Sequence, residues 1–253
     1  MFRTSSLHAG LVASLIAVAC WGAVARAETA HFQCYRAGSD ALVDRTVTLT
    51  DQFGQIEARI ETLERLCNPT DDGGDPGAQD RPERLAEYTL RRLSGYIPPQ
   101  LATVTNQFGS FVLELRHHLP ARALMVPAAV NSTSPAPAAL SPGAISNYTC
   151  YHIHPQPARY YDRVDLEDEM GAQGFITRSA EELCVPAKVD DQEVLAGDGP
   201  LLCFIMRRRS LAVAPRSVFM TDALSSGVAD LQTTRWQHFC VPSTVVGTVL
   251  LPF

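Results

Sequence analysis

Apolar and polar residues alternate in short runs along this chain, and turn-forming residues separate the runs. Residues 46–53 are the clearest case, with Val47 and Leu49 on one side. Residues 111–116 alternate in the same way. A period of two is the pattern of a half-buried β strand. The pattern therefore predicts an all-β protein.

Residues 56–66 fit a helix when they are read alone, because Ile56, Ile60 and Leu63 would share one helix face. Residues 111–116 occupy the same place in a second copy of a repeat and alternate like a strand. Copies of a repeat are expected to fold alike. We therefore predict a strand over 56–66.

The repeat occurs four times. Each copy opens on an apolar segment containing cysteine or tyrosine, passes a segment such as Asp51-Gln52-Phe53-Gly54, and closes on a sequence such as Leu66-Cys67-Asn68-Pro69. The four copies span residues 34–69, 88–127, 148–186 and 202–242. Three strands per copy, separated by regular turns, are typical of a β-sandwich or barrel-like module. Gly54, Gly109 and Gly171 are expected to adopt a positive φ after the second strand.

The repeat also predicts how the cysteines pair. Cys20 lies near the N-terminus, and the other six stand at the opening and closing positions of three copies. The similar separations predict three disulfides, each of which would contribute about 3–4 kcal/mol by constraining the unfolded chain. The predicted pairs are Cys34–Cys67, Cys150–Cys184 and Cys203–Cys240. In the second copy, Leu90 and Met125 are expected to replace the pair.

A stretch rich in proline, alanine and serine divides the copies into two halves. We predict an extended linker over residues 131–146, since this composition does not form a core. The expected domains are 28–130 and 147–253, each a duplicated three-stranded unit.

Residues 1–27 resemble a secretory signal peptide. Arg3 precedes an apolar run over 11–24, and Ala25-Arg26-Ala27 is a small-x-small cleavage site. We expect a mature chain that begins at Glu28 and is secreted or periplasmic. Val18-Ala19-Cys20 resembles a lipobox, so lipoprotein anchoring at Cys20 is the alternative. No later stretch is long and apolar enough to predict a transmembrane helix.

The chain is acidic. Its formal net charge is −6, and loss of Arg3 and Arg26 with the leader would make it −8. Nucleic-acid binding needs a basic face. The charge therefore argues against nucleic acid and anionic membrane surfaces as partners.

The repeat resembles a family of secreted bacterial domains of unknown function. The resemblance rests on Asp51-Gln52-Phe53-Gly54, Leu66-Cys67-Asn68-Pro69, Asn106-Gln107-Phe108-Gly109 and the final Val241-Pro242-Ser243. Departures are Leu90 and Met125 in place of cysteines, and Glu169-Met170 and Ala223-Leu224 in place of Gln-Phe. The resemblance covers nearly all of the mature chain. It implies export and a β fold, but no activity and no site.

Candidate chemistry is sparse. The standard catalytic and phosphate-binding motifs are absent, so we predict no catalytic residue and no organic cofactor. His152 and His154 would share one face of a strand and could bind a metal ion; two exposed histidines are the alternative. Weaker candidates are His117-His118, the acidic residues near 71–75 and 165–169, and Arg207-Arg208-Arg209.

These features favour an exported, noncatalytic binding, adhesion or structural module with an unidentified protein or glycan partner. One alternative is a metal- or small-ligand-binding protein that uses His152 and His154. The other is an extracytoplasmic hydrolase with its site at the domain junction.

Overall fold

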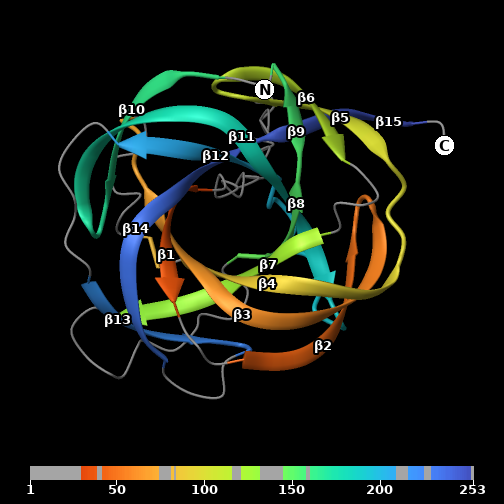
Figure 1. Ribbon diagram of the computed structural model, residues 1–253, viewed down its shortest axis with the longest axis horizontal. Helices are drawn as coiled ribbons and strands as arrows, with labels where there is room; N and C mark the ends of the chain where they lie inside the picture. The colour runs from red at the N-terminus through yellow and green to blue at the C-terminus, as the bar shows by residue number, and fades with distance from the viewer. Residues whose placement is uncertain are drawn as a thin grey trace, which may run out of the picture.

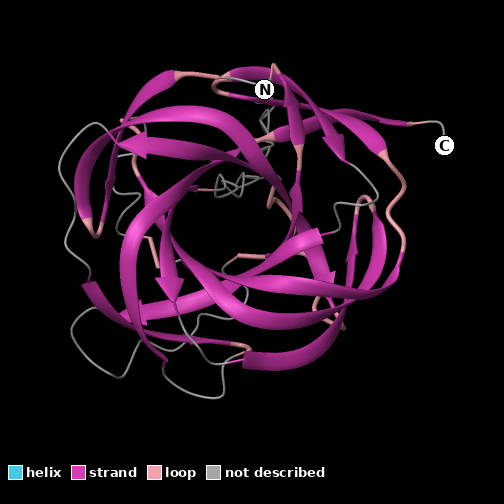
Figure 2. Cartoon of the chain, in the orientation of Figure 1, coloured by secondary structure: helices cyan, strands magenta, loops and turns pink. Residues whose placement is uncertain are grey.

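The structure, a computed structural model, consists of strands and turns. It describes residues 30–38, 42–73, 81–82, 84–115, 121–131, 145–157, 160–208, 216–224 and 229–251. Within these ranges the chain contains no helix (Figure 2), which confirms the all-β prediction. In particular, the described residues contain no helix that is long and apolar enough to cross a membrane. The predicted leader with Cys20, most of the predicted linker, and His117-His118 lie outside the described residues.

The strands follow the four repeats in order. The first repeat comprises β1 (His31–Gly38), β2 (Leu42–Asp51) and β3 (Gly54–Thr70). The second comprises β4 (Arg84–Gly95), β5 (Gln100–Asn106), β6 (Gly109–Leu115) and β7 (Ala121–Asn131). The third comprises β8 (Asn147–His152), β9 (His154–Gln156), β10 (Asp162–Asp168) and β11 (Gly171–Val189). The fourth comprises β12 (Leu201–Arg208), β13 (Arg216–Asp222) and β14 (Ala229–Pro242), and β15 (Thr244–Leu250) follows it.

Residues 56–66 lie within β3, as predicted. The pairing of β3 with β4 explains why these residues resemble a helix. Its register shifts between Ile60 and Leu63 and again between Leu63 and Arg65. Each irregularity displaces the next inward-facing residue along the chain. The apolar spacing therefore departs from two although the backbone is extended.

Eight strands close into a ring (Figure 1), in the order β1, β3, β4, β7, β8, β11, β12, β14. Antiparallel pairing of β14 with β1 completes it. The halves predicted as domains 28–130 and 147–253 therefore share one ring and do not close separately. The physical reason is that each half alone would leave unpaired strand edges at β1 and β7, or at β8 and β14.

Contacts outside the ring join opposite repeats. The end of β11 pairs with β2, where Lys188 lies opposite Thr50. In the same way the end of β7 pairs with β13, and β15 pairs with β5. A bridge between Asp71 and Glu167 joins the first and third repeats. The first and third repeats therefore hold each other, and so do the second and fourth.

Tyrosine hydroxyls reinforce these contacts between opposite repeats. Tyr35 donates to Asp168 over 2.8 Å, and Tyr151 donates to Asp51 over 2.6 Å. Burial raises the pKa of Asp168 to about 6, although the hydroxyl of Tyr35 opposes this shift. The remaining hydroxyl bond runs from Tyr88 to Asp222, 2.5 Å. The fourth repeat has Phe204 in place of the tyrosine, and so it has no hydroxyl to donate. The second repeat has Asn106 in place of the aspartate.

The same four aspartate or asparagine side chains also form the turns after the second strands. Asp51 Oδ1 accepts a hydrogen bond from the backbone N–H of Phe53, 2.8 Å. Asn106, Asp168 and Asp222 accept the equivalent bond, at 2.8–2.9 Å. Gly54, Gly109 and Gly171 follow with φ of 148°, 115° and 115°, which confirms the predicted positive φ. One side chain per repeat thus shapes the turn, and three of the four also bind a tyrosine.

Neighbouring residues of the ring strands point to two different hydrophobic clusters. Cys34 belongs to a cluster that holds all six described cysteines together with Phe32 and Tyr148. The adjacent Tyr35 belongs to a larger cluster that includes Val47 of β2. Alternation along a strand therefore separates a cysteine-containing core from an apolar core that holds the outer strands.

We predict that Tyr151→Phe lowers the free energy of unfolding by about 1–3 kcal/mol, because half-buried Asp51 loses a hydrogen-bond donor. Denaturant unfolding with intact disulfides measures the change. Tyr160→Phe is the control, because its hydroxyl donates to Asp162 in an exposed contact, 2.9 Å. Equal effects of the two substitutions would contradict a structural role for the Tyr151–Asp51 bond.

Candidate functional site

The three disulfides join residues that lie directly opposite each other on neighbouring ring strands. They link Cys34–Cys67, Cys150–Cys184 and Cys203–Cys240, the pairs that the repeat spacing predicts. The Cα atoms of each pair are 3.9 Å apart, and all six cysteines are fully buried. Such disulfides are expected in an oxidising, extracytoplasmic compartment.

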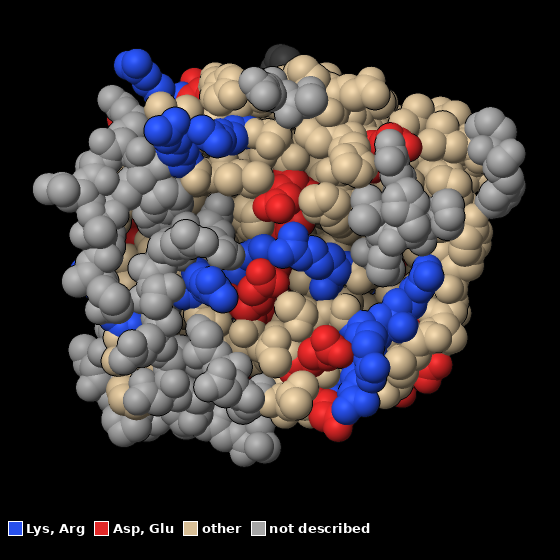
Figure 3. Space-filling view, in the orientation of Figure 1, with Lys and Arg blue, Asp and Glu red and all other residues tan. Residues whose placement is uncertain are grey.

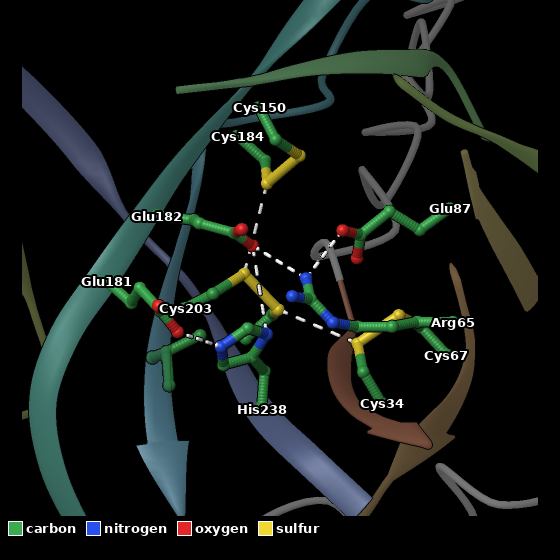
Figure 4. The surroundings of a disulfide bond; sticks show 12 residues. Cys34, Arg65, Cys67, Glu87, Cys150, Glu181, Glu182, Cys184, Cys203 and His238 are labelled. Carbon is green, nitrogen blue, oxygen red and sulfur yellow. Dashed lines mark hydrogen bonds and ion pairs between the residues drawn. A yellow bond between two sulfur atoms is a disulfide. The ribbon is translucent and has the colours of Figure 1, made fainter. Parts of the chain in front are cut away.

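The disulfides also touch one another inside the ring (Figure 4). Cys184 Sγ lies 3.9 Å from Cys203 Sγ, and Cys240 Sγ lies 3.7 Å from Cys34 Sγ. Both distances correspond to van der Waals contact between disulfides. We call the resulting row of six cysteines the cystine belt.

The second repeat completes the belt without cysteine. Met125 lies opposite Glu87, while Leu90 lies opposite Ile60. The prediction that Leu90 replaces the first cysteine is therefore wrong, because Glu87 occupies that position opposite Met125. Glu87-Tyr88 matches Cys34-Tyr35, and this signal in the sequence could have identified Glu87. The carboxylate of Glu87, which is fully buried, therefore takes the place of a sulfur atom.

Arg65 compensates the charge of Glu87. Its Nη1 atom donates to Glu87 Oε1 over 2.5 Å and to Glu182 Oε2 over 2.9 Å. Arg65 precedes Cys67 by two residues and Glu182 precedes Cys184 by two, so both side chains share the belt's face of their strands. None of the three side chains is more than 2% exposed.

Further charges connect this buried group to the surface. His238 Nε2 lies 2.6 Å from Glu181 Oε2, and Arg122 Nη1 lies 3.2 Å from Glu182 Oε1. Exposure of the side chains rises from 3% at His238 to 26% at Glu181 and 36% at Arg122. We call the whole set the ring cluster: Glu64, Arg65, Glu87, Arg122, Glu181, Glu182 and His238.

Charges of both signs also lie side by side on one face of the molecule (Figure 3). This arrangement differs from the single-signed basic patch that is typical of nucleic-acid-binding proteins.

The ring cluster shifts the pKa values of its members in opposite directions. Burial raises the pKa of Glu87, although neighbouring Arg65 opposes the shift. A hydrogen bond with His238 lowers the pKa of Glu181 to about 2. Burial disfavours the charge of Arg65, but Glu87, Glu182 and Glu64 outweigh it and raise the pKa of Arg65. The guanidinium of Arg65 is thus the fixed positive charge around which the acids are arranged.

The predicted metal ligands lie beside the ring cluster. Contrary to the prediction, the two histidines do not share one face of a single strand, because the chain passes from one sheet to the other between them. His152 ends β8 of the large sheet opposite Glu182, and His154 begins β9 of the small sheet opposite Glu114. The two imidazole centres are 5.6 Å apart, edge to face, and burial lowers the pKa of His152. Among the described residues, no group of three or more His, Cys, Asp or Glu side chains could hold a metal ion. Binding of a metal by this pair stays a prediction.

The two acidic candidate segments meet at the backbone bridge between Asp71 and Glu167, but their described side chains do not form a group that could hold a metal ion. Asp168 is buried against Tyr35, while Glu169 forms an ion pair with Arg84. Asp72 accepts a hydrogen bond from Gln107 over 2.5 Å. The charged side chains that do contact one another in the interior form a different set, the ring cluster, whose members are scattered along the sequence.

No family model matches the chain, and neither does any curated protein or solved structure. The resemblance to a family of secreted bacterial domains therefore stays a prediction.

We predict that Glu87→Cys/Met125→Cys forms a fourth disulfide. The two residues are directly opposite, like the three native pairs. Mass spectrometry of the oxidised, unreduced protein should find no free thiol, and peptide mapping should find residues 87 and 125 linked. Met125→Cys alone is the control and should keep one free thiol. A mixture of other pairings in the double variant would contradict this register.

We predict that Glu181→Gln destabilises the protein at neutral pH. The folded pKa of Glu181, about 2, lies below its ordinary value of 4.5, so the stabilisation is present above pH 4.5 and is lost as the pH falls toward 2. The expected loss at pH 7 is on the order of 1–3 kcal/mol. Denaturant unfolding of wild type and variant between pH 7 and pH 2 measures it. Glu193→Gln, in a surface pair with Lys188, is the control; a pH-independent difference for Glu181→Gln would contradict the assignment.

Proposed function

We propose that this chain is an exported, noncatalytic binding module, of the adhesion or structural kind, that meets a protein partner through its small sheet. This sheet has the strand order β15-β5-β6-β9. The proposal includes secretion or periplasmic location directed by residues 1–27, and membership of the secreted domain family that the repeat resembles. The three disulfides support the extracytoplasmic part of the proposal.

The interior of the ring supports a scaffold role. The carboxylates of Glu87 and Glu182 are bound by Arg65, and Glu181 is bound by His238. Breaking a buried ion pair by removing one partner typically costs about 3–5 kcal/mol. These ion pairs join side chains of different strands and so hold the strands in fixed positions.

The observation that carries the proposal is the distribution of exposed apolar side chains. Nine large ones are exposed in the described part of the chain, and four of these lie in the small sheet. They are Val112, Val246, Val249 and Leu250. Val112 and Val249 share one face of this sheet, because their partners on β5, Thr103 and Leu101, are two residues apart. Exposed apolar side chains that share a face mark sites of protein–protein contact.

A photocrosslinking amino acid at position 249 tests this surface. We expect Val249 replaced by benzoylphenylalanine to form protein adducts in the envelope or medium of the producing organism. The same replacement of Leu42, which is 65% exposed on β2, should not. Both positions are equally exposed in the monomer, so a difference reports contact with a partner.

Two results would contradict the proposal. Equal labelling at positions 249 and 42 would reject the small sheet as the contact surface. Turnover of an ester, peptide or glycoside by the purified protein, abolished by Glu181→Gln or His152→Ala while the fold is retained, would reject a noncatalytic role.

A further inference from the structure

Three arginines on neighbouring strands share one face of the large sheet. Arg163 on β10 lies opposite Ile176 on β11, and Ile176 lies opposite Arg207 on β12. Arg178 follows Ile176 by two residues on β11. Residues that are directly opposite, or two apart along a strand, point to the same side of a sheet. We call Arg163, Arg178 and Arg207 the arginine face.

The burial of the neighbouring residues shows that the arginine face points to solvent. Phe175 and Thr177, on either side of Ile176, are fully buried, and so is Met206 beside Arg207. All three arginines are exposed, and Ile176 between them is half-buried. Figure 3 shows basic side chains grouped at the upper left of the molecule, over the end of β12.

The three guanidinium groups are close enough to contact one ligand. Neighbouring strands lie about 4.8 Å apart, so the Cα atoms of Arg163 and Arg207 are separated by roughly 10 Å. Two residues along a strand span roughly 7 Å, which places the Cα atom of Arg178 about 8 Å from each of the other two. Side chains as long as arginine can close such gaps.

The arginine face has no counter-charge within the described part of the protein. No ion pair or hydrogen bond joins its three guanidinium groups to another described residue. Exposed arginines on β2 and β4 differ in this respect, because Arg45 pairs with Asp190 and Arg91 pairs with Glu61. Like charges at these separations repel one another. A ligand of opposite charge would relieve that repulsion.

The acidic side chains nearest to the arginine face are engaged elsewhere or lie farther along the strand. Asp162 accepts a hydrogen bond from the hydroxyl of Tyr160, 2.9 Å, and another from the backbone N–H of Arg163, 2.7 Å. Asp165 and Glu167 share the side of β10 that carries Arg163, but they lie toward the turn between β10 and β11. The positive charge is therefore concentrated at the other end of this surface.

An exposed tyrosine extends the arginine face. Tyr161 immediately precedes β10 and is 60% exposed. Its neighbour Tyr160 packs against Phe108 in the interior, with ring centroids 5.3 Å apart, so alternation turns Tyr161 to the side of Arg163. Tyrosine and arginine are the residue types enriched at protein–protein contacts. This combination favours a protein ligand over a glycan or an inorganic anion.

We propose that the arginine face binds an acidic segment of a protein partner. Carboxylates can accept two parallel hydrogen bonds from one guanidinium group, and clusters of arginine recognise acidic segments in this way. A single exposed ion pair contributes little, so an isolated anion would be held weakly. Several carboxylates on one peptide engage the three arginines together. This surface is separate from the small sheet, and it adds an acidic ligand to the proposed binding module.

Titration of a fluorescein-labelled decaglutamate peptide with the full exported protein tests the inference. Fluorescence anisotropy at a salt concentration of about 50 mM measures the dissociation constant. We expect Arg163→Gln/Arg207→Gln to weaken binding at least tenfold. Arg45→Gln/Arg91→Gln is the matched control, because it removes the same net charge from another surface, and it should change binding less than twofold. Denaturant unfolding verifies that both variants are folded.

Three results would overturn the proposal. The first is wild-type protein that does not bind decaglutamate at about 1 mM. The second is equal weakening by the two double variants, which would report only the net charge of the protein. The third is tighter binding of heparin than of decaglutamate through the same arginines, which would identify a sulfated glycan as the ligand.

The outcome can be separated from that of the proposed function. If the crosslinker at position 249 forms no adduct while decaglutamate binds through the arginines, the arginine face stands and the small sheet is rejected as the contact surface. If adducts form at position 249 and decaglutamate does not bind, the proposed function stands and the inference about the arginine face is overturned.

Discussion

The fold depends on one pairing, that of β1 with β14, between the first and the last strands of the ring. Without it, the eight-stranded sheet would end in two long edges whose backbone groups lack partners. The pairing also sets the size of the folding unit, since it requires both halves of the chain. Contacts between the first and third repeats, and between the second and fourth, add the same requirement.

Inside the ring, the position of the belt is filled either by a disulfide or by a charged side chain with its counter-charges. Three repeats fill the position with a disulfide, which needs no counter-charge. The second repeat places Glu87 there, and Arg65 from the first repeat must then reach it. Arg65 in turn requires Glu182 of the third repeat to complete its contacts. A single departure from the repeat thus accounts for the buried trio of Glu87, Arg65 and Glu182, which comes from three repeats, and His238 extends the ring cluster to the fourth.

The sequence predicts what is local and periodic, and what the repeats share. Strand type, the turns at Gly54 and Gly109, and the partner of each cysteine all follow from residues that recur at similar spacing. Comparison between the copies predicts a strand over 56–66, despite the helix-like spacing of Ile56, Ile60 and Leu63. Bulges in the pairing of β3 produce this spacing. Regular repeats therefore carry more information than any one segment.

The ring and its charged interior lie beyond such reasoning. The spacing of Glu87 and Met125 alone does not show that a carboxylate replaces a sulfur atom. That replacement becomes visible only when Tyr88, which follows Glu87, is aligned with Tyr35. Contacts such as Arg65 with Glu182 depend on which strands become neighbours, and the linker suggests a division that the strand pairing does not follow. Likewise, only the structure shows that β15 lies at the edge of a sheet.

The order of the disulfides has a consequence for how the protein acquires them. Every bond joins a cysteine to the next described cysteine along the chain, Cys34 to Cys67 and onward. When a chain enters an oxidising compartment from its N-terminus, each unpaired thiol meets its native partner before any other free thiol arrives. Oxidation in the order of arrival then gives the native set directly, and exchange between wrong pairs is not needed. In the folded ring the disulfides touch one another, so the order of arrival separates thiols that the final structure brings together.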